Sequence, residues 1–163
     1  MKNIIVLLIS IILSSNLMAA GSDSSSSSSS SEKSLYEEAV KLVKKAGNLE
    51  KKGKTDKAKK NYTKAFSKLE KALKSDKKNP DILNYMGYTS RKVGKFDQAE
   101  KFYLAGLKIK PNHNGINEYL GELYVQTNRI DKANERLTVL KNCKCKEYDE
   151  LELIIKTRGS KVY

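Results

Sequence analysis

The chain is poor in the residues from which most active sites are built. Its 163 residues include one histidine, His113, and two cysteines only one residue apart. A zinc site wants four ligands, and this set does not supply them. The sequence also lacks a Gly-x-Ser-x-Gly element, a dinucleotide-binding fingerprint and paired carboxylates on a predicted cleft. We therefore expect no catalytic residues, no metal and no cofactor, and hence a protein that is not an enzyme.

Arginine is scarce as well, although the chain is strongly basic. The formal net charge is +13, yet arginine occurs only at positions 91, 129, 136 and 158. Proteins that read a nucleic-acid sequence depend on clustered arginines for bidentate contacts to bases. A nucleic-acid partner is therefore disfavoured.

Lysine accounts for most of the positive charge. Residues 35–80 carry fifteen lysines against six acidic residues. Five of them follow one side of a predicted helix, and we call this set the basic ridge: Lys57, Lys60, Lys64, Lys68 and Lys71. Such a ridge attracts polyanions or anionic membrane surfaces. A codon bias that favours lysine explains the same residues as a solvated face, which is the interpretation that the sequence favours.

Long hydrophobic runs are absent except at the N-terminus. One lysine precedes the apolar stretch 4–13, and small residues follow at positions 19–21. This pattern predicts a secretory signal peptide over residues 1–20, since the run is too short for a comfortable membrane span. Residues 21–34 contain an unbroken serine run and are expected to form a flexible linker, with a modified or sticky segment as the alternative.

The remainder of the chain repeats itself with a period of 34 residues. Six positions recur at this offset, and the first copy holds the residues Leu83, Met86, Gly87, Ala99, Tyr103 and Gly106. The second copy has Leu120 and Gly121 in place of Met86 and Gly87, but Asn117 stands where a large apolar residue is expected. A period of this length predicts helical hairpins that bury their apolar faces by stacking in a solenoid.

A third copy lies upstream and is longer by seven residues. Gly53 corresponds to Gly94 at an offset of 41, and the insertion predicts a continuous helix over residues 56–76. Asn128 takes the place of Gly94 at the last turn. Residues 147–156 are expected to form a capping helix.

The best copy resembles the tetratricopeptide repeat. The resemblance rests on Leu83-x-x-Met86-Gly87, on Gly94 at the turn, on Ala99-x-x-x-Tyr103 and on Pro111 at the end. It implies an all-α, right-handed α-solenoid of three hairpins over residues 35–157. The first hairpin would have an elongated second helix, a capping helix would end the array, and residues 158–163 would form a tail.

The same resemblance implies a concave groove lined by the first helix of each hairpin. The groove candidates that it gives are Asn84, Tyr88, Arg91, Lys92, Glu118, Tyr119, Glu122 and Gln126. Tyrosine among mixed charges suits a protein or peptide segment, whereas ordinary exposed residues are the plain alternative. Family members that clamp a C-terminal carboxylate place Lys, Arg and Asn at such positions, so Glu118 and Glu122 disfavour that ligand.

Cys143 and Cys145 lie between the last hairpin and the cap. Export to an oxidising compartment favours a local disulfide bond between them. Free or intermolecular thiols and a thiol-exchange pair are the alternatives. The run from Leu140 to Leu151 also resembles the C-terminal end of small exported tetratricopeptide proteins of Gram-negative bacteria, whose cysteines stand further apart.

These observations predict an exported adaptor, periplasmic or secreted, that binds a protein partner without catalysis. The alternative is a basic protein that docks on anionic envelope polymers or lipid through the basic ridge. His113 lies in a turn between hairpins and is expected to be a surface residue.

Overall fold

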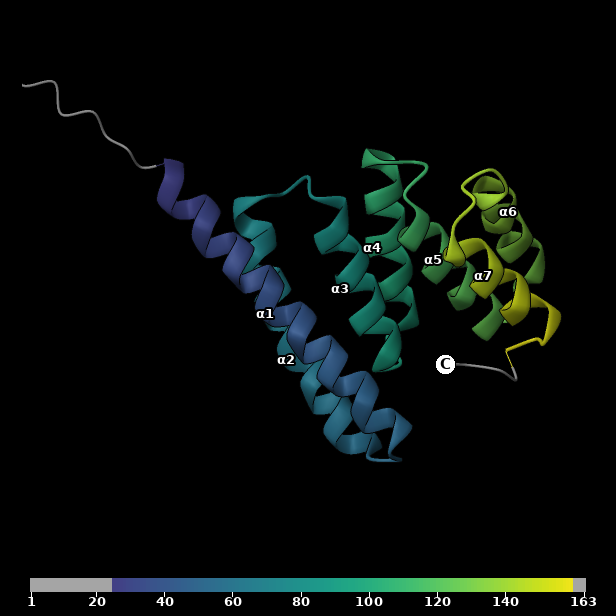
Figure 1. Ribbon diagram of the computed structural model, residues 1–163, viewed down its shortest axis with the longest axis horizontal. Helices are drawn as coiled ribbons and strands as arrows, with labels where there is room; N and C mark the ends of the chain where they lie inside the picture. The colour runs from purple at the N-terminus through teal and green to yellow at the C-terminus, as the bar shows by residue number, and fades with distance from the viewer. Residues whose placement is uncertain (1–24, 160–163) are drawn as a thin grey trace, which may run out of the picture.

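The computed structural model describes residues 25–159, with side chains from Ser34 onward. In this part of the chain there are seven helices and no strand, namely α1 (Ser25–Lys51), α2 (Thr55–Ser75), α3 (Pro80–Lys92), α4 (Phe96–Ile109), α5 (Asn114–Gln126), α6 (Ile130–Leu140) and α7 (Lys146–Lys156). Helices α1 and α2, α3 and α4, and α5 and α6 pair as hairpins, while α7 packs on α5 and α6 (Figure 1). The predicted all-α array of three hairpins and a capping helix is confirmed.

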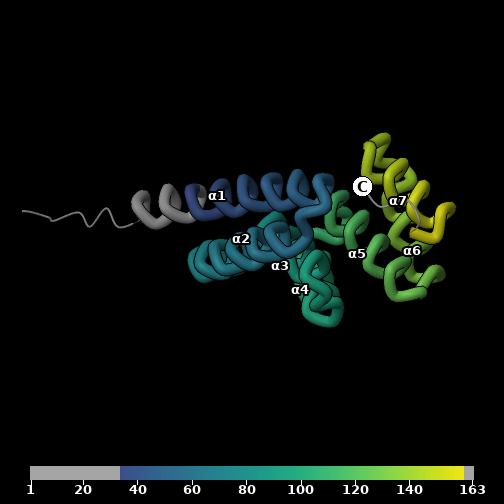
Figure 2. Tube along the Cα trace, turned by 90° about the horizontal axis from the view of Figure 1, so that it is seen from below, coloured from purple at the N-terminus to yellow at the C-terminus, as the bar shows by residue number. Residues whose placement is uncertain are grey.

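The hairpins follow one another along the long axis of the molecule (Figure 2). One cluster of buried side chains joins α1, α2 and α3, and a second joins α4, α5, α6 and α7. Each hairpin therefore completes its core only by packing on its neighbours, as expected of a solenoid.

The three turns within hairpins share one backbone geometry. Gly53, Gly94 and Asn128 have φ values of 68°, 85° and 57°, which lie in the left-handed region. The next residue in each turn donates its N–H to a carbonyl five residues back, at N···O distances of 2.9, 2.9 and 2.7 Å. Such bonds satisfy free carbonyls at the end of a helix, and asparagine is one of the few residues besides glycine that accepts this conformation. The repeat found in the sequence is thus a repeat of local structure.

The predicted long second helix is present in the first hairpin. Helix α2 has 21 residues and α4 has 14, so the inserted seven residues lengthen the helix without breaking it. Its buried positions follow alternating steps of four and three, and they are Ala58, Tyr62, Ala65, Leu69 and Ala72. Seven residues are close to two helical turns, which is why the apolar stripe continues through the insertion.

Glycine allows close packing at two equivalent positions of the array. A Cβ atom added to Gly87 would collide with the ring of Tyr103 on α4. A Cβ atom added to Gly121 would lie 2.5 Å from a methyl carbon of Leu151 on α7. The glycine that recurs in the sequence is therefore explained by what packs against each first helix.

The serine run differs from the prediction. The sequence predicts a flexible linker over residues 21–34, but α1 begins at Ser25. No proline or glycine interrupts residues 25–34, and serine has an intermediate helix propensity. The helix formed by residues 35–51 therefore extends toward the N-terminus as far as Ser25. The predicted signal peptide lies outside the described residues.

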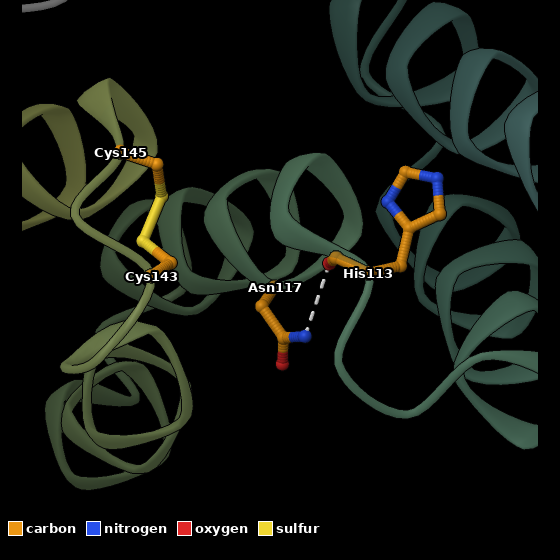
Figure 3. The surroundings of a disulfide bond; sticks show 4 residues. All are labelled: His113, Asn117, Cys143 and Cys145. Carbon is orange, nitrogen blue, oxygen red and sulfur yellow. Dashed lines mark hydrogen bonds between the residues drawn. A yellow bond between two sulfur atoms is a disulfide. The ribbon is translucent and has the colours of Figure 1, made fainter.

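His113 and Asn117 at the start of α5 also depart from expectation (Figure 3). His113 is buried rather than exposed, because its Nδ1 accepts the N–H of Ile116 and its Nε2 donates to Asp81 Oδ1 at 2.9 Å. Asn117 is fully buried where a large apolar residue is usual. Its Nδ2 donates to the carbonyls of Pro111 and His113, and its Oδ1 accepts from Arg136. These hydrogen bonds compensate for burying a polar side chain.

The described residues contain neither a membrane-spanning helix nor a metal-binding cluster. None of the helices between residues 25 and 159 is long and apolar enough to cross a membrane. The same residues contain no group of three or more His, Cys, Asp or Glu side chains that could hold a metal ion.

Candidate binding groove

Two adjoining cavities lie along the face formed by α1, α3, α5 and α7. The first, which we call the α1 cavity, has a volume of about 480 Å³ and is lined by Val43, Lys44, Gly47, Asn48, Glu50, Lys51, Tyr85, Tyr88 and Tyr119. The second, the α7 cavity, has a volume of about 190 Å³ and is lined by Tyr88, Arg91, Lys92, Glu118, Tyr119, Glu122, Lys146 and Glu150. Tyr88 and Tyr119 line both cavities, which therefore form one groove.

The middle of the groove is aromatic. The rings of Tyr88 and Tyr119 lie 4.9 Å apart between centroids, and Tyr62 of α2 meets the Tyr88 ring edge-on at 5.9 Å. The guanidinium of Arg91 lies 5.5 Å from the Tyr88 centroid and 5.8 Å from that of Tyr119. Burial raises the pKa of both Tyr88 and Tyr119, so their hydroxyl groups remain protonated and able to donate.

A buried ion pair joins α3 to α5 beneath these rings. Arg91 pairs with Glu122, and the two side chains are 3% and 9% exposed. Burial is the largest single effect and lowers the pKa of Arg91, but the Glu122 carboxylate, Tyr103 and Tyr88 together outweigh it, and the net pKa is raised. Both charges are taken from water, so each depends on the other to remain buried.

A second ion pair joins α1 to α3. Lys92 Nζ lies 2.7 Å from Glu50 Oε2, and the Tyr62 hydroxyl donates to the same oxygen at 2.9 Å. The side chains of Lys92 and Glu50 are 15% and 27% exposed, so this pair is less buried than the first. Together the two pairs fix the first helices of all three hairpins relative to one another.

Glu118 is the exception among the charged residues of the groove. It is 4% exposed, and the Glu150 carboxyl of α7 lines the same cavity. Burial, the neighbouring Glu150 carboxyl and the charges of Glu122 and Glu147 raise the pKa of Glu118 to about 10. A carboxyl group with this pKa is protonated at neutral pH and is a hydrogen-bond donor.

The structure brings six of the eight predicted groove residues together around the α7 cavity. Asn84 and Gln126 line neither cavity. Asn84 is buried, and its Nδ2 would lie 3.0 Å from a Cβ atom at Gly115, so the start of α5 covers it. Gln126 is exposed in the last turn of α5. Arg91 and Glu122 line the α7 cavity, but their charged groups form an ion pair with each other.

The contribution of α1 to the groove is absent from the sequence prediction, although a signal for it exists. Four residues of α1 line the α1 cavity, namely Lys44, Gly47, Glu50 and Lys51. The offset of 41 residues that relates Gly53 to Gly94 also relates these four to residues of α3. On α7, Lys146 and Glu150 line the groove without any counterpart in the repeat. The sequence could not place these two residues in the groove, because their position depends on how α7 packs on α5.

The basic ridge and the cysteines lie apart from the groove. No ridge lysine lines either cavity. Lys68 pairs with Glu38 of α1, whereas Lys57, Lys60, Lys64 and Lys71 are exposed. Cys143 and Cys145 form a disulfide bond in the loop between α6 and α7, with their Cα atoms 5.1 Å apart (Figure 3).

Comparison with known proteins gives one family match. The model of the tetratricopeptide repeat matches residues 68–101, which run from the second half of α2 through α3 into α4. No match to the chain is found among curated proteins.

Several solved structures are similar. The type III secretion chaperone SycD of Yersinia enterocolitica, in complex with a peptide of the translocator YopD, is 17% identical with a TM-score of 0.52, over 73% of this chain and 87% of that one. The second TPR domain of human RPAP3, with an HSP70 peptide, is 18% identical with a TM-score of 0.47, over 75% and 98%. PcrH, with the chaperone-binding region of PopD, is 15% identical with a TM-score of 0.48, over 74% and 90%.

At 17% identity, the Yersinia chaperone supports the fold of this chain. The family match covers one repeat unit, and the structure shows the same turn in all three hairpins. Residues 68–101 therefore match a tetratricopeptide repeat, and the described part of the chain has the helical-repeat fold.

Proposed function

We propose that this protein is an exported, non-catalytic adaptor that holds a peptide or protein segment in the groove formed by α1, α3, α5 and α7. The observation that carries the proposal is the pair of adjoining cavities with Tyr88 and Tyr119 between them. Tyrosine offers a large rigid apolar surface with a polar tip, and such residues dominate binding energy at protein interfaces. The signal peptide predicted from the sequence supports the export.

The fold of the Yersinia chaperone supports the same ligand class, since that protein is solved with a peptide. The groove here is elongated, because it runs from Lys44 and Asn48 on α1 to Lys146 and Glu150 on α7. An extended segment suits this shape better than a compact small molecule. The mixed charges along it would select the segment by its own charge pattern.

Site-specific photocrosslinking tests this proposal. The full chain would carry a photoreactive amino acid in place of Asn48, inside the groove, or in place of Lys60, on the basic ridge. Envelope extracts would be irradiated at low and at high salt and the products identified by mass spectrometry. We expect one or two proteins to crosslink at position 48 and to persist at high salt. Crosslinks formed only at position 60 would refute groove binding.

A second candidate function uses the basic ridge. Four exposed lysines on one helix support docking on anionic envelope polymers or lipid. This binding would weaken steeply with salt and would be lost when Lys57, Lys60 and Lys64 are changed to Glu, because released counterions drive it. Groove binding would be unaffected by these changes and would be lost in Tyr88→Ala or Tyr119→Ala.

A further inference from the structure

The charged side chains around the α7 cavity are paired, with one exception. Arg91 pairs with Glu122, Lys92 Nζ lies 2.7 Å from Glu50, and Lys146 Nζ lies 3.8 Å from Glu150. Glu118 also lines this cavity, but none of the ion pairs in the described part of the chain includes it. One acidic side chain of the cavity therefore has no cationic partner.

The surroundings of Glu118 explain why its charge is not compensated. Only 4% of the residue is exposed, so water does not replace the missing cation. The charged and titratable groups that face it come from α3, α5 and α7, and they are Tyr88, Arg91, Lys92, Tyr119, Glu122, Lys146, Glu147 and Glu150. Arg91 and Lys92 are committed to other carboxylates, and Lys146 is 75% exposed beside Glu150.

Two carboxyl groups meet where a cation is missing. Glu118 and Glu150 both line the α7 cavity, and neighbouring carboxyl groups in a buried site favour a proton on one of them. The burial and the neighbouring negative charges keep that proton on Glu118, whose pKa is raised to about 10. The proton supplies the positive charge that no side chain between residues 34 and 159 supplies.

We propose that the α7 cavity binds a cationic side chain, lysine or arginine, of the partner segment, and that this cation replaces the proton held by Glu118. The cavity combines two tyrosine rings with carboxyl groups, and both kinds of group attract an ammonium or guanidinium ion. On binding, Glu118 releases one proton to solvent and its carboxylate pairs with the incoming cation. The only bond broken is the O–H bond of the Glu118 carboxyl, and water accepts its proton. The inference rests on the proposed function, since it names the residue type that the groove selects.

Simple amino-acid analogues test this site without knowledge of the partner. The probes are N-acetyl-lysine methylamide, N-acetyl-arginine methylamide and the uncharged N-acetyl-norleucine methylamide, titrated into the full chain. Ring signals of Tyr88 and Tyr119 report binding by NMR, and calorimetry in two buffers of different ionisation enthalpy reports proton release. We expect the two cationic probes to bind with release of up to one proton. Their association constants should rise roughly tenfold per pH unit between pH 6 and 8.

Matched variants separate the role of Glu118 from a general charge effect. Glu118→Gln keeps the shape and a hydrogen-bond donor toward Glu150, so it should fold, which circular dichroism checks. It should lower the association constants of the cationic probes at least tenfold and abolish proton release. Glu152→Gln makes the same substitution on α7 outside the cavity and should alter neither.

Three results would overturn the inference. They are equal binding of the norleucine probe, binding of the cationic probes without proton release, and no binding of any probe at its solubility limit. Crosslinking of a partner at position 48 in the Glu118→Gln variant, at the level of the unchanged protein, would also contradict a dominant role for this site. That last result would leave the proposed function standing.

Discussion

The carboxyl group of Glu118 links the stability of the molecule to pH. Its pKa is about 10 in the folded chain and near the ordinary value of 4.5 when exposed, so the folded state holds a proton that the unfolded state has lost between these values. Its contribution to stability is therefore fully present below pH 4.5 and is lost as the pH rises toward 10. Through this one group the free energy of unfolding falls by at most about 1.4 kcal/mol per pH unit.

Urea unfolding at several pH values checks this prediction. The Glu118→Gln variant should lack the decline that the unchanged protein shows between pH 6 and 9, and it should be the more stable of the two at pH 8. Identical pH profiles for the two proteins would show that Glu118 is ionised in the folded state.

Two glycines of helical conformation should respond to alanine in opposite directions. At Gly87 the new Cβ would collide with the Tyr103 ring, which is fully buried and cannot move away, so we expect a loss of about 1–3 kcal/mol. At Gly47 the nearest atom would be the Tyr62 hydroxyl at 4.0 Å, so the variant should gain about 0.5–1 kcal/mol from helix propensity. Chemical denaturation measures the change in the free energy of unfolding for each variant. Changes of the same sign at the two positions would contradict the packing described here.

At the scale of helices, the Arg91–Glu122 pair holds α3 against α5. Arg91→Ala would leave the Glu122 carboxylate buried without its partner and should cost about 3–5 kcal/mol. A double change to Met at both positions removes both charges and should recover most of that loss, since apolar residues of similar size often replace a buried pair without penalty. Thermal unfolding of the single and double variants measures this recovery. A double variant no more stable than Arg91→Ala would contradict the prediction.

The disulfide bond between Cys143 and Cys145 closes a very short loop in the connection between α6 and α7. The loss of chain entropy on closing a loop of three residues corresponds to only about 1–2 kcal/mol. Changing both cysteines to Ser should therefore lower the melting temperature slightly and leave the helical spectrum intact. A collapse of α7, seen as loss of helical signal at 222 nm, would show that the bond positions the cap rather than merely restraining it.

At the scale of the whole molecule, the repeating parts were predictable and the connections between repeats were not. Gly53, Gly94 and Asn128 mark the turns because each needs a left-handed backbone, and this need is local. The stripe from Ala58 to Ala72 likewise follows from helical periodicity alone. The predicted fold is correct for this reason.

The errors concern residues whose surroundings come from another hairpin. Asn84 is covered by the start of α5, and His113 is buried against α3, where Asp81 accepts a hydrogen bond from its Nε2. The uncompensated carboxyl of Glu118 depends on how α7 packs against α5. Such contacts are fixed by the angle between successive hairpins, which no single repeat in the sequence specifies.

The central claim is that a partner segment binds in the groove. An amide chemical-shift map of the full chain, recorded with and without the segment identified by crosslinking, tests it most directly. The account predicts that the changes gather on α1, α3, α5 and α7 around Tyr88 and Tyr119, and that they disappear in Tyr88→Ala. Changes gathered instead on α2 around Lys57, Lys60 and Lys64, and sensitive to salt, would contradict it.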